Sequence, residues 1–215
     1  MKHVIHALTA ACALILPAMT TGARTAADFF VSAPDEALIL IDRNTRMDML
    51  DYFNNNLPTA SQNVVGGTSR ILENAPNRIE LNVGRDSNVK IAVIPERRDT
   101  IIAVIETVLT PVPDSYVRIY NKNWNPIRYS TPDMPSAMDF VPKELRKEAA
   151  KAVMPDVCFA VADYNPDKGT FTMNNTTRAY YIGQDQPDGL ALMRTSIEMV
   201  FAGRRFVEVN PEKAK

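Results

Sequence analysis

The strongest constraint on the fold is a strict alternation of apolar and polar residues in the middle of the chain. Ile79, Leu81 and Val83 alternate with polar neighbours, and the same period of two resumes after a turn. Because successive side chains of a strand point to opposite faces, this period places the apolar side chains on one face of a sheet. Residues 100–109 are almost wholly apolar, which predicts a central strand covered on both faces. We therefore predict a meander of antiparallel hairpins over residues 69–129.

Three stretches carry helix signals. Residues 32–41 combine capping-box spacing with apolar residues on one helical face, and residues 45–48 repeat the capping signature ahead of a helix predicted over residues 47–53. A third helix is predicted after a capping signature at residues 136–139, with Pro142 near its first turn. Its apolar face would carry residues spaced by four, namely Val141, Leu145, Ala149 and Val153.

Hairpins centred on residues 165–169 and 202–204 follow the third helix signal. Both halves of the chain, residues 28–130 and 131–210, therefore show a helical signal followed by antiparallel strands. The predicted fold is α+β, an antiparallel β-sheet meander with helices packed on it. Residues 28–215 are predicted to form one domain, with two tandem helix-plus-sheet units as a candidate division.

The first residues have the pattern of a secretory leader. A short positive segment, residues 1–3, precedes an apolar run over residues 4–19, which is too short for a stable membrane span. Small-residue cleavage frames end at Ala23 and at Ala27, and the sequence favours the second, which gives a signal peptide over residues 1–27. No later stretch is long and apolar enough to predict a span. We therefore expect an exported protein, periplasmic or otherwise secreted.

Removal of that leader changes the chemistry that the chain can perform. Residues 1–27 contain Lys2, Arg24 and no acid, so 22 basic residues face 25 acidic ones and the net charge is −3, which argues against a nucleic-acid partner. Both histidines, His3 and His6, lie in the leader. Without histidine the mature chain has no serine–histidine triad and no imidazole metal ligand. We expect neither a metal nor a cofactor.

Two features that suggest chemistry also have simple structural explanations. Cys158 is the one cysteine outside the leader, so it has no intramolecular disulfide partner, and its apolar surroundings predict a buried thiol in a strand. Residues 163–169 have acidic or amide side chains at alternate positions, as calcium loops do. The glycine comes one place late and the flanks are β-prone, so a hairpin turn is favoured over a metal site.

A few residues are candidates for a functional site. Asp48 and Asp51 would share one face of the helix at 47–53, close to Arg46 and Tyr52. A carboxylate pair of this kind can hydrolyse glycosides, although caps and ion pairs are the more common use. Trp124, the one tryptophan, lies beside a turn, where it could stack on a sugar or anchor the strands. Trp124, Arg46 and Tyr52 are the candidate binding residues.

Residues 27–35, 46–53 and 110–115, with the sequences ADFFVSAPD, RMDMLDYF and TPVPDS, resemble an uncharacterised family of exported proteins from Bacteroidales. The resemblance covers essentially the whole mature chain. It implies a Gram-negative envelope and supplies no catalytic residues.

These observations predict a non-enzymatic envelope protein that binds a macromolecule, either another protein or a glycan. The alternative is a glycan hydrolase that uses Asp48 and Asp51. An open cleft around these two carboxylates would favour the hydrolase, and a helix cap with ion-pair partners would favour the binding protein.

Overall fold

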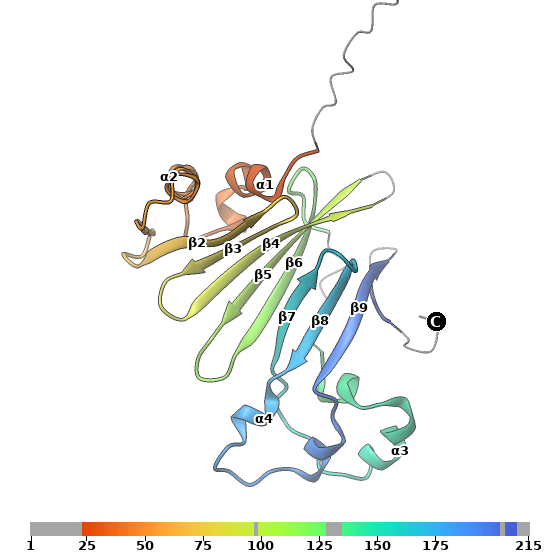
Figure 1. Ribbon diagram of the computed structural model, residues 1–215. Helices are drawn as coiled ribbons and strands as arrows, with labels where there is room; N and C mark the ends of the chain where they lie inside the picture. The colour runs from red at the N-terminus through yellow and green to blue at the C-terminus, as the bar shows by residue number, and fades with distance from the viewer. Residues whose placement is uncertain (1–22, 97–98, 128–134, 203–204, 210–215) are drawn as a thin grey trace, which may run out of the picture.

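A computed structural model describes residues 23–96, 99–127, 135–202 and 205–209. Two antiparallel sheets of six and four strands lie next to each other, with α1 and α2 beside the first sheet and α3 and α4 at the far end of the second (Figure 1). This arrangement confirms the predicted α+β class with antiparallel sheet. None of the helices within the described ranges is long and apolar enough to cross a bilayer.

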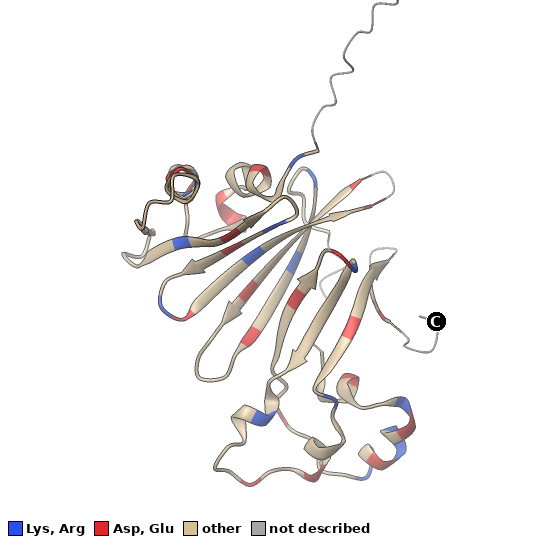
Figure 2. Ribbon diagram, in the orientation of Figure 1, with Lys and Arg blue, Asp and Glu red and all other residues tan. Residues whose placement is uncertain are grey.

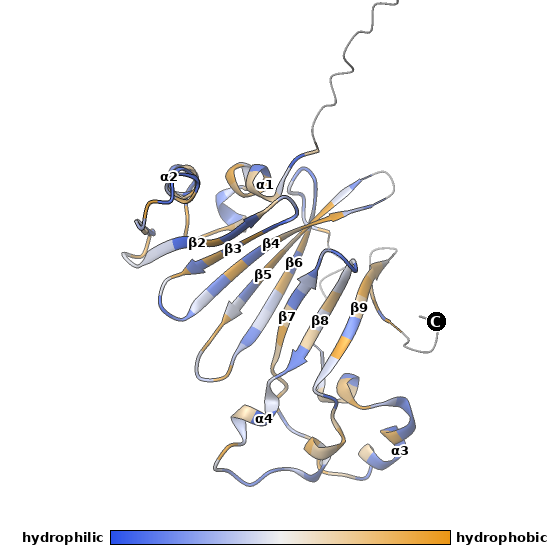
Figure 3. Cartoon of the chain, viewed as in Figure 1, coloured by the Kyte–Doolittle hydropathy of each residue, from blue (hydrophilic) through white to orange (hydrophobic). Residues whose placement is uncertain are grey.

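The first sheet is a simple meander, as the alternation predicts, because its six strands lie in sequence order. Ile79 pairs with Ile91 across two neighbouring strands, which puts the alternating apolar residues on a common face. Figure 3 shows polar and apolar residues alternating along these strands. The strands are β1 (Ser61–Gln62), β2 (Thr68–Ala75), β3 (Arg78–Val83), β4 (Ser87–Pro95), β5 (Thr100–Val108) and β6 (Asp114–Asn121).

The fifth strand, β5, is covered on both faces, as its apolar composition predicts. Ile102 and Val104 belong to the core beneath the N-terminal helices, whereas Ala103 and Ile105 belong to a second core shared with the other sheet. A strand with two buried faces is mostly apolar for this reason. β5 therefore contributes to both cores, as does its neighbour β4 through Ile91 and Ala92.

One face of the first sheet is covered by α1 (Ala26–Ser32), the 3-10 turn η1 (Asp35–Ala37) and α2 (Arg43–Asn54). Phe29 and Phe30 of α1 are fully buried in this core. The helix predicted over residues 32–41 is wrong, because the capping box is formed by Thr25 and Asp28 and α1 ends at Ser32. The second helix is confirmed, but Asp42 caps it and it begins at Arg43, earlier than predicted.

The third predicted helix is wrong as a continuous helix up to Val153. Its capping box of Ser136 and Asp139 forms, but the segment is divided into η2 (Ala137–Phe140), η3 (Lys143–Leu145) and α3 (Arg146–Ala149). Val141 is extended, with ψ 124°, because the residue before a proline avoids the helical region. Val153, predicted on the buried face, is exposed.

The second sheet contains β7 (Ala160–Asn165), β8 (Thr170–Asn175), β9 (Ser196–Ala202) and β10 (Arg205–Glu208), with α4 (Thr177–Tyr180) and the 3-10 turn η4 (Asp188–Leu192) between β8 and β9. The predicted turn between β7 and β8 is confirmed. The Oδ1 atom of Asn165 accepts hydrogen bonds from the backbone N–H groups of Asp167 and Lys168, and Gly169 has φ +65°. A positive φ of this kind is why the turn needs glycine there.

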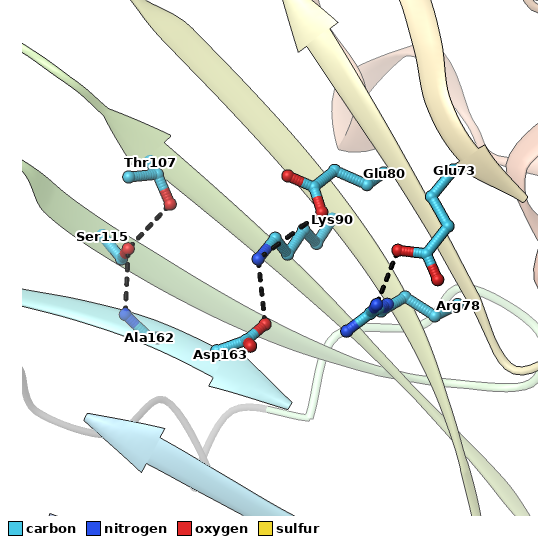
Figure 4. Close-up of polar contacts among 8 residues, drawn as sticks. All are labelled: Glu73, Arg78, Glu80, Lys90, Thr107, Ser115, Ala162 and Asp163. Carbon is cyan, nitrogen blue, oxygen red and sulfur yellow. Dashed lines mark hydrogen bonds and ion pairs between the residues drawn. The ribbon is translucent and has the colours of Figure 1, made fainter. Parts of the chain in front are cut away.

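Side chains of β5 and β6 join the two sheets. The Ser115 hydroxyl accepts a hydrogen bond of 3.1 Å from the backbone N–H of Ala162 and lies 2.8 Å from the Thr107 hydroxyl (Figure 4). The Asp114 carboxylate accepts a further bond of 3.0 Å from the backbone N–H of Ala160. These side-chain acceptors satisfy N–H groups of β7, which is an edge strand of its own sheet.

Candidate functional site

An apolar groove lies at one end of the first sheet. Its volume is about 300 Å³. One wall is the loop of residues 38–41, and the other is formed by residue 83, residues 87–89 and residues 106–108 of β3, β4 and β5. Four separate segments therefore build one surface, and most of their side chains in it are aliphatic. We call this surface the apolar groove.

Large aliphatic side chains are exposed around the apolar groove. Ile39 is 70% exposed and Val108 is 51% exposed, and both line it. Val64, also exposed, lies beside the groove because its backbone N–H donates to the Leu40 carbonyl at 3.1 Å. Exposed apolar side chains gathered in one place mark surfaces that contact another molecule.

Arg46 of α2 holds one end of the groove loop. Its side chain is only 1% exposed, and its two Nη atoms donate to the carbonyls of Ile41 and Ala33, each at 2.6 Å. Nη1 also lies 3.1 Å from the exposed carboxylate of Asp35. Burial lowers the pKa of Arg46, and the hydrogen bond and charge of Asp35 oppose that shift. Arg46 therefore shapes the loop from inside the protein.

Arg118 of β6 binds residues 36 and 37, which directly precede the groove loop. Its Nη1 and Nη2 atoms donate to the backbone carbonyls of Glu36, at 3.3 Å, and Ala37, at 2.9 Å. The same guanidinium forms an ion pair with Glu106, which lines the groove. Two arginines thus tie residues 33–41 to α2 and to the sheet, so the groove wall is held in place before any partner arrives.

The residues predicted to bind a ligand do not form a common surface. Arg46 is buried, and Tyr52 is half-buried elsewhere on α2. Trp124 is 8% exposed and lies in the core against Tyr120, with ring centroids 5.2 Å apart. Its indole N–H has no hydrogen-bond partner within the described residues. This position matches the anchoring alternative for Trp124.

The carboxylates of Asp48 and Asp51 are both exposed on α2. The Asn55 side chain donates to the backbone carbonyl and to Oδ1 of Asp51, at 2.9 and 3.0 Å. Neither aspartate lines the apolar groove, and neither has an ion-pair partner among the described side chains.

Charged residues occur along the strands of both sheets (Figure 2). Lys90 of β4 lies 2.9 Å from Asp163 of β7 and 3.6 Å from Glu80 of β3 (Figure 4). Arg78 and Glu73 pair at 2.5 Å beside them. The Asp163 carboxylate thus connects the two sheets.

The described residues contain no cluster of histidine, cysteine, aspartate and glutamate suited to a metal ion. Cys158 is half-buried and accepts a weak hydrogen bond, 3.8 Å long, from the Thr177 hydroxyl. Burial raises the pKa of Cys158, which favours the unreactive thiol over the thiolate.

The sequence does not predict that Ile39 and Val108 form a groove. Its patterns place Ile39 in a helix and Val108 near the end of a strand. One signal was available: four consecutive aliphatic residues at 38–41 cannot all face one core from a helix. Nothing local pairs that segment with Val108, because the two are distant in the sequence.

Comparison with known proteins places this architecture among proteins whose activity is not established. A solved structure described as a domain of an uncharacterised protein from Porphyromonas gingivalis W83, a member of the Bacteroidales, is similar in fold, with a TM-score of 0.62 and 18% identity. The match covers 85% of this chain and 96% of that one. A search of curated proteins finds no match. The family model for proteins of unknown function DUF3256 matches residues 18–206, and the chain therefore belongs to this family.

Proposed function

We propose that the mature chain is an exported, non-enzymatic envelope protein that binds another protein through the apolar groove. The observation that carries this proposal is the group of exposed aliphatic side chains around a groove of about 300 Å³. A volume of this size suits one or two apolar side chains of a partner, which act as the anchors of an interface.

The lining of the groove favours a protein over a glycan. Leu38, Ile39 and Val108 offer no hydrogen bonds from their side chains, so sugar hydroxyls placed there would lose their water and gain few partners. An aliphatic or aromatic side chain has no such cost, because burial of its surface is favourable at about 25 cal/mol per Å².

The two arginines that hold the groove loop support the same proposal. Arg46 and Arg118 together bond to four backbone carbonyls between residues 33 and 41. A loop fixed in advance loses little conformational entropy when a partner binds, which leaves more of the contact energy for affinity. We infer that these arginines position the groove and do not touch the partner.

Site-specific cross-linking tests the proposal. A photo-reactive benzoylphenylalanine at position 39 should cross-link a discrete envelope protein in whole cells, and the same residue at position 182 should not. Ile182 is a matched control, since it is 77% exposed and does not line the groove. The cross-linked species should disappear when Val108→Asp is added, because a charge in the groove disfavours an apolar anchor.

Three results would count against this proposal. Equal cross-linking from positions 39 and 182, unaffected by Val108→Asp, would mean that the groove is not the contact site. Hydrolysis of an envelope or dietary glycan by the wild type that is lost in both Asp48→Asn and Asp51→Asn would support the hydrolase alternative instead. Binding of a glycan that survives Ile39→Asp would place a ligand on another surface.

A further inference from the structure

The first turn of α1 bears on where the leader is removed. The Thr25 hydroxyl accepts a hydrogen bond of 3.2 Å from the backbone N–H of Asp28, and the Asp28 carboxylate accepts bonds from the backbone N–H and the hydroxyl of Thr25, at 2.7 and 2.8 Å. This capping box satisfies amide groups that the first turn of a helix leaves without partners. Thr25 is therefore part of the folded unit.

Ala26 also belongs to the folded unit. Its side chain is fully buried in the first core, and its backbone N–H donates to the Pro76 carbonyl at 2.8 Å. The bond between Ala27 and Asp28 lies within α1, after two residues that the helix requires. Cleavage there would remove the cap, the buried alanine and the link to the turn between β2 and β3.

Arg24 marks the outer limit of these contacts. Its guanidinium lies 4.1 Å from the centroid of the Phe29 ring, and its Nη1 atom donates to the Lys122 carbonyl at 3.3 Å. Both Ala23 and Arg24 are exposed. The contacts that stabilise the N-terminal end of the domain thus begin at Arg24.

We propose that a leader peptidase hydrolyses the bond between Ala23 and Arg24. Water adds to the Ala23 carbonyl and the peptide bond breaks, which leaves a carboxylate on Ala23 and an α-amino group on Arg24. This proposal rests on the export that we propose above. Thr21 and Ala23 supply the small residues that the peptidase recognises in this frame.

The fold does not prevent use of the second frame, because leader peptidases act on the extended chain during export. Instead, the fold makes the product of that cleavage less stable. A chain that begins at Asp28 lacks the capping threonine and the buried Ala26, so it should unfold at a lower temperature than a chain that begins at Arg24. Cleavage in the first frame yields a complete α1.

The test is expression of the full chain in a Gram-negative host, followed by intact-mass measurement and N-terminal sequencing of the periplasmic protein. We expect a chain that begins at Arg24. Ala23→Gln should block this cleavage, because the recognised position needs a small residue, whereas Ala27→Gln should leave it unchanged. The second variant is the matched control, since it makes the same replacement in the other frame.

The outcomes separate this proposal from the proposed function. An exported chain that begins at Asp28, or one whose processing is blocked by Ala27→Gln and not by Ala23→Gln, would overturn the cleavage position and leave export intact. A full-length chain retained in the cytoplasm would overturn both proposals.

Discussion

At the scale of single residues, a buried arginine controls the shape of an exposed surface. Arg46 has almost no contact with solvent, yet its two hydrogen bonds to backbone carbonyls hold both ends of the segment that carries Ile39. Its ionic partner, Asp35, is exposed. The carbonyls of Ala33 and Ile41 are therefore the groups that depend most on this side chain.

We predict that Arg46→Met lowers the free energy of unfolding by about 2–3 kcal/mol, because methionine fills part of the volume but leaves these carbonyls without donors. Urea denaturation of the purified domain measures this change. Arg43→Met is the control: Arg43 is exposed on the same helix, so its replacement should change stability by no more than about 0.5 kcal/mol. Equal effects of the two substitutions would contradict the role assigned to Arg46.

At the scale of elements, α1 shows how a short helix is stabilised by its first turn. It has only seven residues, too few to be stable alone in water. Its capping box and the burial of Phe29 and Phe30 compensate for this. The hydrogen bonds from Thr25 also lower the pKa of Asp28, because they favour the ionised carboxylate.

The lowered pKa of Asp28 predicts how the stability of the domain depends on pH. The ionised carboxylate stabilises the folded state above the pKa of the unfolded chain, near pH 4, and this contribution is lost as the pH falls through the lower folded pKa. Asp28→Asn should therefore be less stable than the wild type at pH 7, and the difference should shrink as the pH falls below about 4. Denaturation series at several pH values test this, and a difference independent of pH would contradict it.

At the scale of the whole molecule, hydrogen bonds from side chains hold two separate sheets together. The ladders of the sheets end at β6 and β7, and the Ser115 hydroxyl bridges them through the Ala162 backbone. The ion pair between Lys90 and Asp163 also connects the sheets, but its carboxylate is well exposed. Solvent screens such a pair, so it contributes little.

We predict that Ser115→Ala destabilises the protein by about 1–3 kcal/mol, because the buried N–H of Ala162 loses its acceptor. Asp163→Asn should cost at most about 1 kcal/mol, since it removes only a partly exposed ion pair. Thermal or urea unfolding of the two variants gives the comparison. If the aspartate variant were the less stable of the two, the ion pair and not the buried hydrogen bond would hold the sheets together.

Local patterns in the sequence determined the sheet. The two-residue period around Ile79 and the apolar run of β5 predicted antiparallel strands that the structure contains, because the side chains of a strand alternate regardless of its neighbours. The turn at residues 165–169 was also predictable, since proline, asparagine and glycine act through their own backbone preferences. Helix positions were less certain: residues 32–41 had a plausible capping signature, but Thr25 formed the cap that the protein uses.

Tertiary structure alone decided the candidate site. The apolar groove brings Ile39 beside Val108, and the loop that carries Ile39 is held by Arg46 from α2 and Arg118 from β6. The sequence predicted Arg46 as a binding residue from its position close to Asp48 and Asp51 on a helix. It is buried because the carbonyls of a distant loop replace water as its hydrogen-bond partners, and contacts between distant segments leave no periodic signal in the chain.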